Sequence, residues 1–513
     1  MRTTLTSLAP ELIEEICAKV QESYSSTLAE IKRDLRNLRL VCQQTRTPPE
    51  HYLFRDITLD ARKKRALSFL TASQVQEAIA KDMTIFRNAR VLRLQFGSAE
   101  STKGWNQIKM DGMSDAFVVP ILSAFRSVKS VEWRVEGADP CPQILDALST
   151  LPEMTTLILH FNRVPFHDFT LLKLPRLKRL AILNTLEQNF TKTLLQEITE
   201  LLETHTTLTH VAIDTKFPFS PDGPRFRFPK PPSAPASVPT EGDALEATTG
   251  DEPGPLQGPA LQSLRLHGCG FVFKARPYLS TLTTLEVQNE DYPSNRTIWA
   301  SLYHVENVKL KSIVVDSLHP FLIQYLQSYS GLEKLIFTEP KDRAELIGPI
   351  PPQHQAELGS MDADFYTKIV PLHQDSLQSL SLYHLSPSDW RPSDSKTAAL
   401  LRCSKLSTLS IDFSCNNLST LPVRLKRVLS TLLKFEALRF LAINLVTSGG
   451  DTSLGRWGVE GGIMDYPVPR EGAFKISTGT CFFVPTLDGD RRRWRKVPFK
   501  AAPDMAIQLG WVL

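Results

Sequence analysis

The sequence is sparing in cysteine, and its seven cysteines include no C-x-x-C pair and no regular spacing. A scattered, odd-numbered set argues against a disulfide framework or a zinc site and fits reduced thiols. Long apolar runs are also missing, because no stretch approaches the roughly 18 residues of a membrane span. Residues 1–17 carry acidic side chains where a signal peptide needs an unbroken apolar core. We therefore expect a protein without membrane contact that is cytoplasmic and/or nuclear.

Motifs for catalysis and cofactor binding are absent as well. The sequence contains no G-x-x-x-x-G-K-[ST] phosphate loop, no H-E-x-x-H metal pair and no G-x-S-x-G nucleophile elbow. The glycines of residues 455–462 have no predicted strand before them and no predicted helix after them, so we interpret this stretch as a loop. A net charge of +4 on 513 residues does not favour nucleic acid as the main partner. We expect a protein that is not an enzyme and needs no metal or cofactor.

What the sequence does contain is a repeat. Residues 261–269, LQSLRLHGC, show the L-x-x-L-x-L pattern that is typical of leucine-rich repeats. About a dozen segments share this alternation, and most begin about 20 to 32 residues apart, which leaves room for one strand and one helix per repeat. These predicted strands cover residues 91–96, 131–135, 156–161, 179–184, 210–214, 263–268, 284–289, 312–316, 334–338, 379–384, 408–413 and 440–444.

The segments between these strands have helical features. Pro142 stands at a predicted helix start and Pro152 just past its end, while Pro320 and Gly331 bracket another helix in the same way. Residues 194–202 place their leucines and isoleucine on one face at a helical period. Strand and helix therefore alternate, and we predict an α/β fold: a leucine-rich-repeat solenoid whose parallel strands curve into a horseshoe.

Changes in composition divide the chain into parts. We predict the solenoid over residues 61–448, interrupted at 217–259 by a disordered segment rich in Pro, Gly, Ser, Thr and acidic residues. Residues 339–371 form a second, less extreme insertion. If the array restarts after the first insertion, the strands at 210–214 and 263–267 should lie in one sheet. Residues 449–513 begin loop-like, continue as short strands around the turn at Asp488, and are predicted to be a C-terminal cap.

Residues 1–60 carry a different pattern. L-x-P-E-L-I-x-x-I at residues 8–16 is followed by L-R-x-L-R-L-V-C at 35–42 and by Y-L-F-R-D-I-T-L at 52–59. This order resembles the N-terminal F-box of fungal F-box proteins. The resemblance implies a small helical domain that docks onto a Skp1-type adaptor of a cullin–RING ubiquitin ligase. It assigns adaptor-facing and core positions to Leu8, Pro10, Leu12, Ile13, Ile16, Leu35, Leu38 and Val41. Alternatively, these helices are a plain cap on the first repeat.

The face of the strands opposite the leucines is the candidate surface for a substrate. By alternation it carries Arg93, Glu132, Arg134, His160, Asp214, Arg265, His267, Glu286, Asp316, Tyr383 and Asp412. Arginine and aromatic side chains among mixed charges can anchor a protein partner. A solvent-facing strand also carries polar residues when it has no partner, so the surface as a whole is more informative than any one residue.

Together these features predict the substrate-recognition subunit of an SCF-type E3 ubiquitin ligase. Its partners would be a Skp1-type adaptor, through it a cullin–RING ligase, and an unidentified protein substrate. The alternative is a leucine-rich-repeat interaction scaffold unconnected to ubiquitination. A nucleic-acid binder would instead need a continuous basic face on the solenoid.

Overall fold

The fold is taken from a computed structural model of the chain. It describes residues 54–60, 84–95, 118–165 without 138 and 140, 169–185, 188–215 without 205 and 206, 225–227, 260–288 without 269 and 273–278, 293–338 without 305–307 and 317, 361–382 without 362, 394–446 without 415–420 and 433, 453–466, 475–478, 481–488 and 491–498, together with Cys17, Glu77 and Ile79. The chain divides into two compact units, Met1–Leu282 and Thr283–Leu513.

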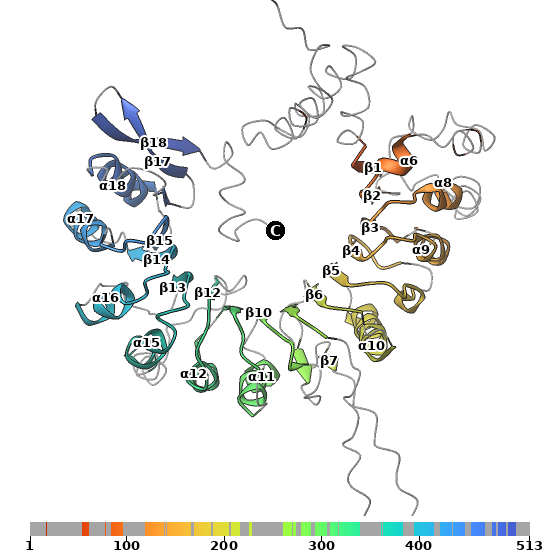
Figure 1. Cartoon of the computed structure of the whole chain (residues 1–513), viewed down its shortest axis with the longest axis horizontal. Coiled ribbons are helices and arrows are strands. Elements are labelled where there is room, and N and C mark those ends of the chain that lie inside the picture. Colours follow the sequence, from red (N-terminus) through yellow and green to blue (C-terminus); the bar gives the residue numbers. More distant parts are fainter. Residues whose placement is uncertain are drawn as a thin grey trace, which may run out of the picture. The chain divides into compact units, whose positions relative to one another are not determined.

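The first unit is an array of parallel strands that follow one another in chain order. The strands are β1 (Asp56–Asp60), β2 (Val91–Gln95), β3 (Ser130–Val135), β4 (Thr156–Phe161), β5 (Arg179–Thr185), β6 (His210–Thr215) and β8 (Ser263–His267). The helical segments between them are α6 (Thr84–Asn88), α8 (Val119–Ala124), α9 (Cys141–Ser149), the 3-10 turn η4 (Leu171–Lys173) and α10 (Gln188–Thr204). These segments lie along one face of the strands, and no described helix covers the other face (Figure 1).

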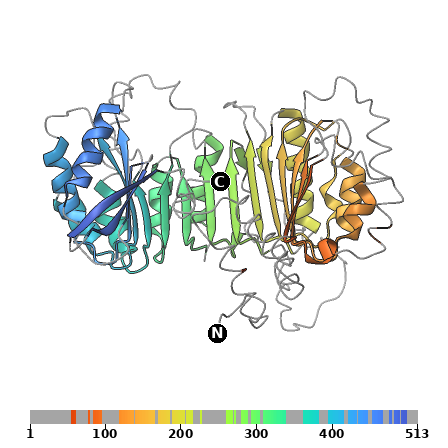
Figure 2. The same ribbon diagram turned by 90° about the horizontal axis from the view of Figure 1, so that it is seen from above.

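The second unit repeats this construction. Its strands are β10 (Thr284–Gln288), β11 (Ser312–Val315), β12 (Lys334–Phe337), β13 (Ser379–Leu382), β14 (Thr408–Ser414), β15 (Phe440–Val446), β16 (Lys475–Ser477), β17 (Cys481–Asp488) and β18 (Arg491–Pro498). Pairing is parallel from β10 to β16 and antiparallel in the β16–β17–β18 meander that ends the unit. The helices are α11 (Pro293–Tyr303), α12 (Pro320–Gln327), the π-helical η6 (Phe365–Ile369), α15 (Val370–Leu372), α16 (Asp394–Leu401), α17 (Leu421–Leu432) and α18 (Ser453–Met464). Within each unit the neighbouring strands stand side by side (Figure 2).

Alternation along the strands decides which side chains form the core. In β2, Leu92 and Leu94 are fully buried while the residues between them are partly exposed. Helices contribute the opposite wall, as in α9, where Ile144 and Leu148 are fully buried. Every predicted strand is present, and no end differs by more than two residues from its predicted position. The sequence pattern thus predicts the parallel α/β array correctly.

The sheet continues across the first insertion, as predicted. Strand β8 pairs in parallel with β6, from His210 opposite Ser263 to Asp214 opposite His267. One part of the prediction for this insertion is wrong: Arg225–Arg227 is not disordered but forms a short strand, β7, which pairs with β9 (Gly270–Val272). The rest of 217–259 lies outside the described residues.

The second insertion contains helical segments at its C-terminal end. The residues of η6 and α15 are helical, and Phe365, Tyr366, Ile369 and Val370 are buried. Phe365 lies edge-on to Phe337 of β12, with their ring centroids 6.3 Å apart. These aromatic contacts place the segment in the helical layer of the second unit.

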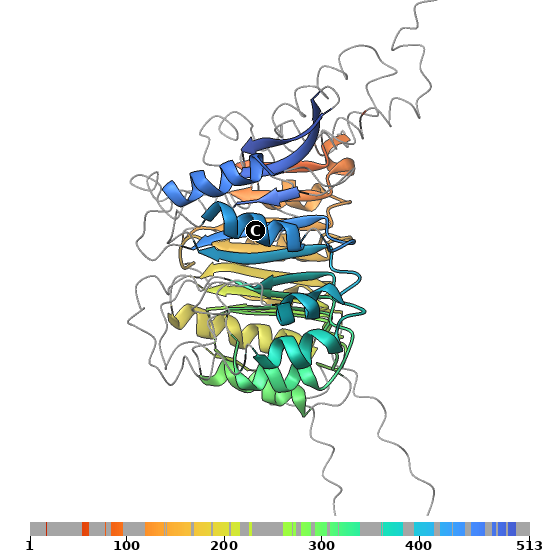
Figure 3. The same ribbon diagram turned by 90° about the vertical axis from the view of Figure 1, so that its left-hand side faces the viewer.

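Residues 453–464 are a helix, α18, and not the predicted loop. The reason is the close packing of α18 against α17 (Figure 3). A Cβ atom on Gly458 would lie 2.6 Å from Cδ2 of Leu421, and one on Gly462 would lie 2.7 Å from Cδ2 of Leu425. Glycines four residues apart therefore make a smooth strip where the two helices meet, although glycine disfavours an isolated helix.

A buried polar cluster joins β3 to the loop that precedes α9. The indole Nε1 of Trp133 and the backbone N–H of Glu136 each donate a 3.0 Å hydrogen bond to Oδ2 of Asp139. Trp133 and Asp139 are both fully buried. Burial raises the pKa of Asp139 from its ordinary 3.8 to about 7, even though both donors favour the carboxylate. This carboxyl group is therefore set to change its charge near neutral pH.

The proposed adaptor-facing positions, Leu8, Pro10, Leu12, Ile13, Ile16, Leu35, Leu38 and Val41, lie outside the described residues. In that part of the chain Cys17 is described, and it is helical and buried. Among the described residues, no helix combines the length and the apolar character that crossing a membrane requires.

Candidate functional site: the open face of the first unit

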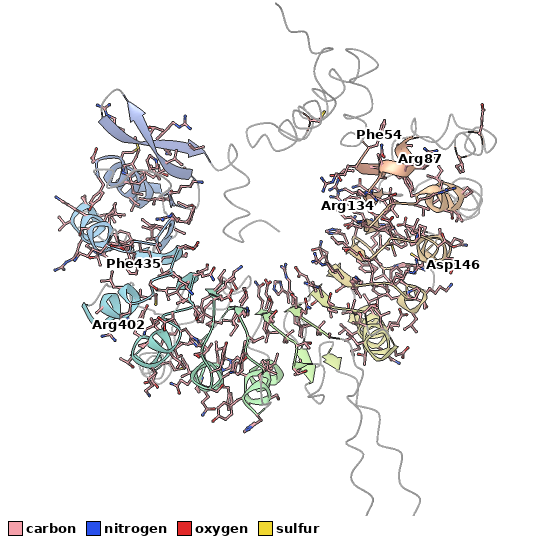
Figure 4. The ribbon with its side chains drawn as sticks, viewed as in Figure 1. Phe54, Arg87, Arg134, Asp146, Arg402 and Phe435 are labelled. Atoms are coloured by element: carbon pink, nitrogen blue, oxygen red, sulfur yellow. The ribbon has the colours of Figure 1, made fainter. Side chains whose placement is uncertain are left out.

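The face of the first unit that no described helix covers is called the open face here. Cross-strand pairing arranges its side chains in rows that run from strand to strand. One row, called the middle row, is Arg93, Glu132, Ile158, Ala181, Ala212 and Arg265. The next, called the upper row, is Gln95, Arg134, His160, Leu183, Asp214 and His267. The side chain of Arg134 points away from the helices, whereas Asp146 of α9 lies on the helical side (Figure 4).

A chain of charged contacts occupies the β1–β4 side of the open face. Arg93 donates a 2.9 Å hydrogen bond from Nε to Glu132, and its Nη1 lies 3.8 Å from the carboxylate of Asp56. The imidazole of His160 lies 3.6 Å from the other oxygen of Glu132. Partial burial of these side chains reduces solvent screening, so the contacts orient one another. Strands β1 to β4 thus bring together three predicted contact residues, Arg93, Glu132 and His160, and a fourth residue, Asp56.

The protonation of His160 follows from its surroundings. Burial lowers its pKa, the nearby Glu132 raises it, and the nearby Arg134 lowers it. Burial is the largest of these effects, so the imidazole is neutral at pH 7 and its contact with Glu132 is polar rather than ionic. Arg134 itself is exposed on the open face and makes no ion pair with the described residues. It is the predicted cation most available to a partner.

The centre of the open face is apolar. Ile158, Ala181, Leu183 and Ala212 occupy adjacent positions on β4, β5 and β6, and each is partly exposed. Charged residues flank them on both sides, with Arg93 and Glu132 towards β2 and β3 and Arg265 on β8. An apolar centre inside a polar rim is the usual anatomy of a protein-binding surface. Sequence reasoning missed these four residues because it selected polar side chains, although the same alternation places both kinds on one face.

The β8 side of the open face differs from the prediction. His267 pairs with Asp214 as expected, but its side chain is only 3% exposed. Its Nδ1 lies 3.3 Å from the guanidinium of Arg265 and 3.8 Å from the carboxylate of Asp214. The prediction of His267 as an exposed contact residue is therefore wrong, because it is packed between these two charges. Arg265 and Asp214 remain partly exposed.

The predicted contact residues of the second unit have mixed outcomes. Glu286 is partly exposed on β10, as predicted. Asp316 is buried, at 7% exposure, so its prediction as a contact residue is wrong. It follows the last residue of β11, where the strict alternation of a strand no longer holds. Tyr383 lies outside the described residues, and so does the side chain of Asp412, whose backbone belongs to β14.

The described side chains include potential metal ligands and thiols. No group of three or more His, Cys, Asp or Glu among the described residues is arranged to hold a metal ion. Cys141, Cys403 and Cys481 are buried. Burial raises the pKa of Cys403 to about 11 and also raises those of Cys141 and Cys481, which disfavours the reactive thiolate.

Comparisons with known proteins do not assign the chain to a family. No family model matches its sequence, and no curated protein matches it either. Among solved structures it is similar to a chain in the crystal structure of the Rad7 and Elc1 complex in yeast. That match has a TM-score of 0.38 and 12% sequence identity, and it covers 89% of this chain and 97% of that chain. A likeness of this degree assigns neither a family nor a function.

Proposed function

We propose that the protein is a substrate receptor of an SCF-type ubiquitin ligase that acts in the cytoplasm or nucleus. The N-terminal helices would bind a Skp1-type adaptor, and the open face would hold a protein substrate. The observation that carries the substrate half is the apolar centre of the open face, formed by Ile158, Ala181, Leu183 and Ala212 inside a charged rim. The adaptor half is supported by the order of the F-box-like motifs in residues 8–59.

The open face suits recognition because its backbone is held in a regular sheet. Six parallel strand pairings fix the spacing of the rows in the first unit, and neighbouring strands lie about 4.8 Å apart. A partner that docks here would not need to order a flexible loop, so little conformational entropy is lost on binding. Arg134 would supply an exposed cation beside the apolar centre.

The mechanism that we propose is tethering. Binding adaptor and substrate at once raises the effective concentration of the substrate near the ligase, with no new reactive group on this chain. Ubiquitin transfer would take place on other subunits of the assembly. The chain itself would need to bind the adaptor and the substrate, and it would need no catalytic residue.

Charge placed in the first motif should abolish adaptor binding. We expect the Leu8→Glu, Pro10→Glu, Ile13→Glu variant to lose co-purification with a Skp1-type adaptor, because an apolar helix face cannot be buried once it carries charge. The measurement is a pull-down with purified adaptor, together with thermal unfolding to show that the repeat array stays folded.

Two control variants sharpen this experiment. Thr3→Glu, Thr6→Glu, Ser7→Glu introduces the same charge in the same segment and should leave adaptor binding intact. Leu183→Glu alters the open face and should also leave it intact. Adaptor binding that persists in the Leu8, Pro10 and Ile13 variant refutes the F-box assignment. A native chain that does not bind the adaptor favours the interaction scaffold instead.

A further inference from the structure

The loops that lead from each helix into the next strand lie together at one edge of the first unit. The residue before each strand continues the ladder of backbone hydrogen bonds. The amide of Lys129 donates to the carbonyl of Arg90 at 2.9 Å, and the amide of Lys178 donates to that of Thr155 at 2.8 Å. The amide of Arg90 in turn donates to the carbonyl of Arg55 at 2.8 Å. Backbone pairing therefore fixes the positions of these residues along the edge.

This edge carries an excess of positive charge, and we call it the basic edge. It consists of Arg55, Arg90, Arg126, Lys129, Arg176 and Lys178, all of which are exposed. In the described helix-to-strand loops of the first unit the acidic residue is Glu153, which lies 3.3 Å from Arg90. Arg55, Arg126, Lys129 and Lys178 form no ion pair with any described residue. The basic edge thus holds several charges that are not neutralised within the described part of the chain.

The spacing of the basic edge is regular. Arg55, Arg90 and Lys129 precede consecutive strands, so their backbones lie about 4.8 Å apart, and Lys178 stands two strands further along. Arg126 and Arg176 lie in the loops just before Lys129 and Lys178 and add a second line of cations. Like charges at this spacing repel one another, and a polyanion laid along the edge would relieve that repulsion.

The surroundings of the basic edge favour a nucleic acid over a protein partner. A stable protein interface needs an apolar centre. The apolar side chains of these loops, such as Phe125, Leu151 and Leu177, are buried instead. The large hydrophobic side chains found exposed among the described residues all lie in the second unit. No aromatic ring in the described part of the edge is fully exposed for stacking on unpaired bases, and Phe54, beside Arg55, is only partly exposed.

We propose that the basic edge binds the phosphate backbone of a nucleic acid duplex without reading its bases. This activity goes beyond the proposed receptor function and does not depend on it. Composition conceals the edge because acidic residues elsewhere offset it, for example in residues 241–252, which contain acids and no lysine or arginine. The small net charge of +4 is therefore compatible with a segregated basic surface.

The salt dependence of duplex binding tests this proposal. With the full chain and a fluorescent random-sequence DNA duplex, log affinity should fall linearly with log salt concentration. In the variant Arg126→Gln, Lys129→Gln, Lys178→Gln, the slope should flatten by about 2.7, because each phosphate contact contributes about 0.9. Affinity at low salt should fall at least about tenfold. An RNA duplex of the same sequence measured in parallel shows which source of phosphate binds more tightly.

A matched control separates the basic edge from net charge. Arg163→Gln, Lys192→Gln, Lys426→Gln removes the same charge from exposed positions outside the edge and should bind like the native chain. Equal losses in the two variants, or no duplex binding by the native chain, would overturn the proposal. If polyglutamate at the same concentration of charge displaces the DNA, the nucleic-acid proposal is overturned, and an acidic protein segment becomes the better candidate for the ligand of the basic edge. Unchanged thermal unfolding in both variants shows that any loss is local.

Discussion

The variant Asp139→Asn is expected to be more stable than the native chain above neutral pH and similar to it near pH 4. Burial raises the pKa of Asp139 to about 7, so between pH 4 and pH 7 the folded state keeps a proton that the unfolded state has released. The native free energy of unfolding therefore decreases as pH rises through this range, by up to about 4 kcal/mol. Below about pH 4 and above about pH 7 this contribution is constant.

Asparagine preserves the geometry of the cluster without this titration. Its carbonyl oxygen can accept the hydrogen bonds that Trp133 and the Glu136 amide give to Oδ2. Urea unfolding of both proteins at about pH 5 and about pH 7.5 gives the change in the free energy of unfolding between the two pH values. The effect of Asp139 is the amount by which this change differs between the variant and the native chain. Burial lowers the pKa of His160, His210 and His373, so these groups stabilise the protein as pH rises towards 6.5. Their contributions to the free energy of unfolding are the same in both proteins and cancel when the two are compared. A pH-independent difference would contradict the assignment to Asp139.

Gly268→Ala should lower the free energy of unfolding by at least about 2 kcal/mol, because two effects add. Gly268 has a φ of 68°, in the left-handed region that favours glycine. A Cβ atom there would also lie 2.4 Å from the carbonyl oxygen of Thr215 and 2.6 Å from its Oγ1. The hydroxyl of Thr215 donates a 2.7 Å hydrogen bond to the carbonyl of Gly268, so moving apart would break a buried contact. Urea unfolding of the variant and the native chain measures the loss.

Gly331→Ala is the matched control for this prediction. Gly331 also has a positive φ, 105°, but a Cβ atom on it would meet nothing within 4 Å. Its substitution should therefore show the conformational cost alone, about 1–2 kcal/mol. Equal losses in the two variants would show that the close approach to Thr215 does not matter. A larger loss for Gly268→Ala assigns the difference to the junction of β6 and β8.

Periodicity predicts the strands well because the alternation of Leu92 and Leu94, or Leu264 and Leu266, is imposed by the core itself. It fails where a partner element sets the local structure. The strip of Gly458 and Gly462 suits a helix only because Leu421 and Leu425 of α17 lie against it, and no local signal shows that contact. In the same way, Arg225–Arg227 forms a strand because a distant segment, Gly270–Val272, pairs with it.

The candidate site shows the same limits. Alternation places Arg93, Glu132 and His160 on one face, and the structure confirms that they are brought together. It does not predict that His267 is covered, because burial at a strand end depends on where the chain turns next. The basic edge was also missed. Its cations are scattered through the sequence, and they become neighbours only through the parallel ladder.

The uninterrupted pairing of β6 with β8 makes the segment between them a natural attachment point for engineering. The register runs without a shift from His210 to Asp214, although a long segment separates the two strands in the sequence. Closing a flexible loop becomes only about 0.6 kcal/mol more costly each time its length doubles. A fluorescent reporter or a protease cleavage sequence placed within residues 228–259 should therefore leave the array folded. None of the residues named for the open face or the basic edge belongs to this segment, so labelling it changes neither set of side chains.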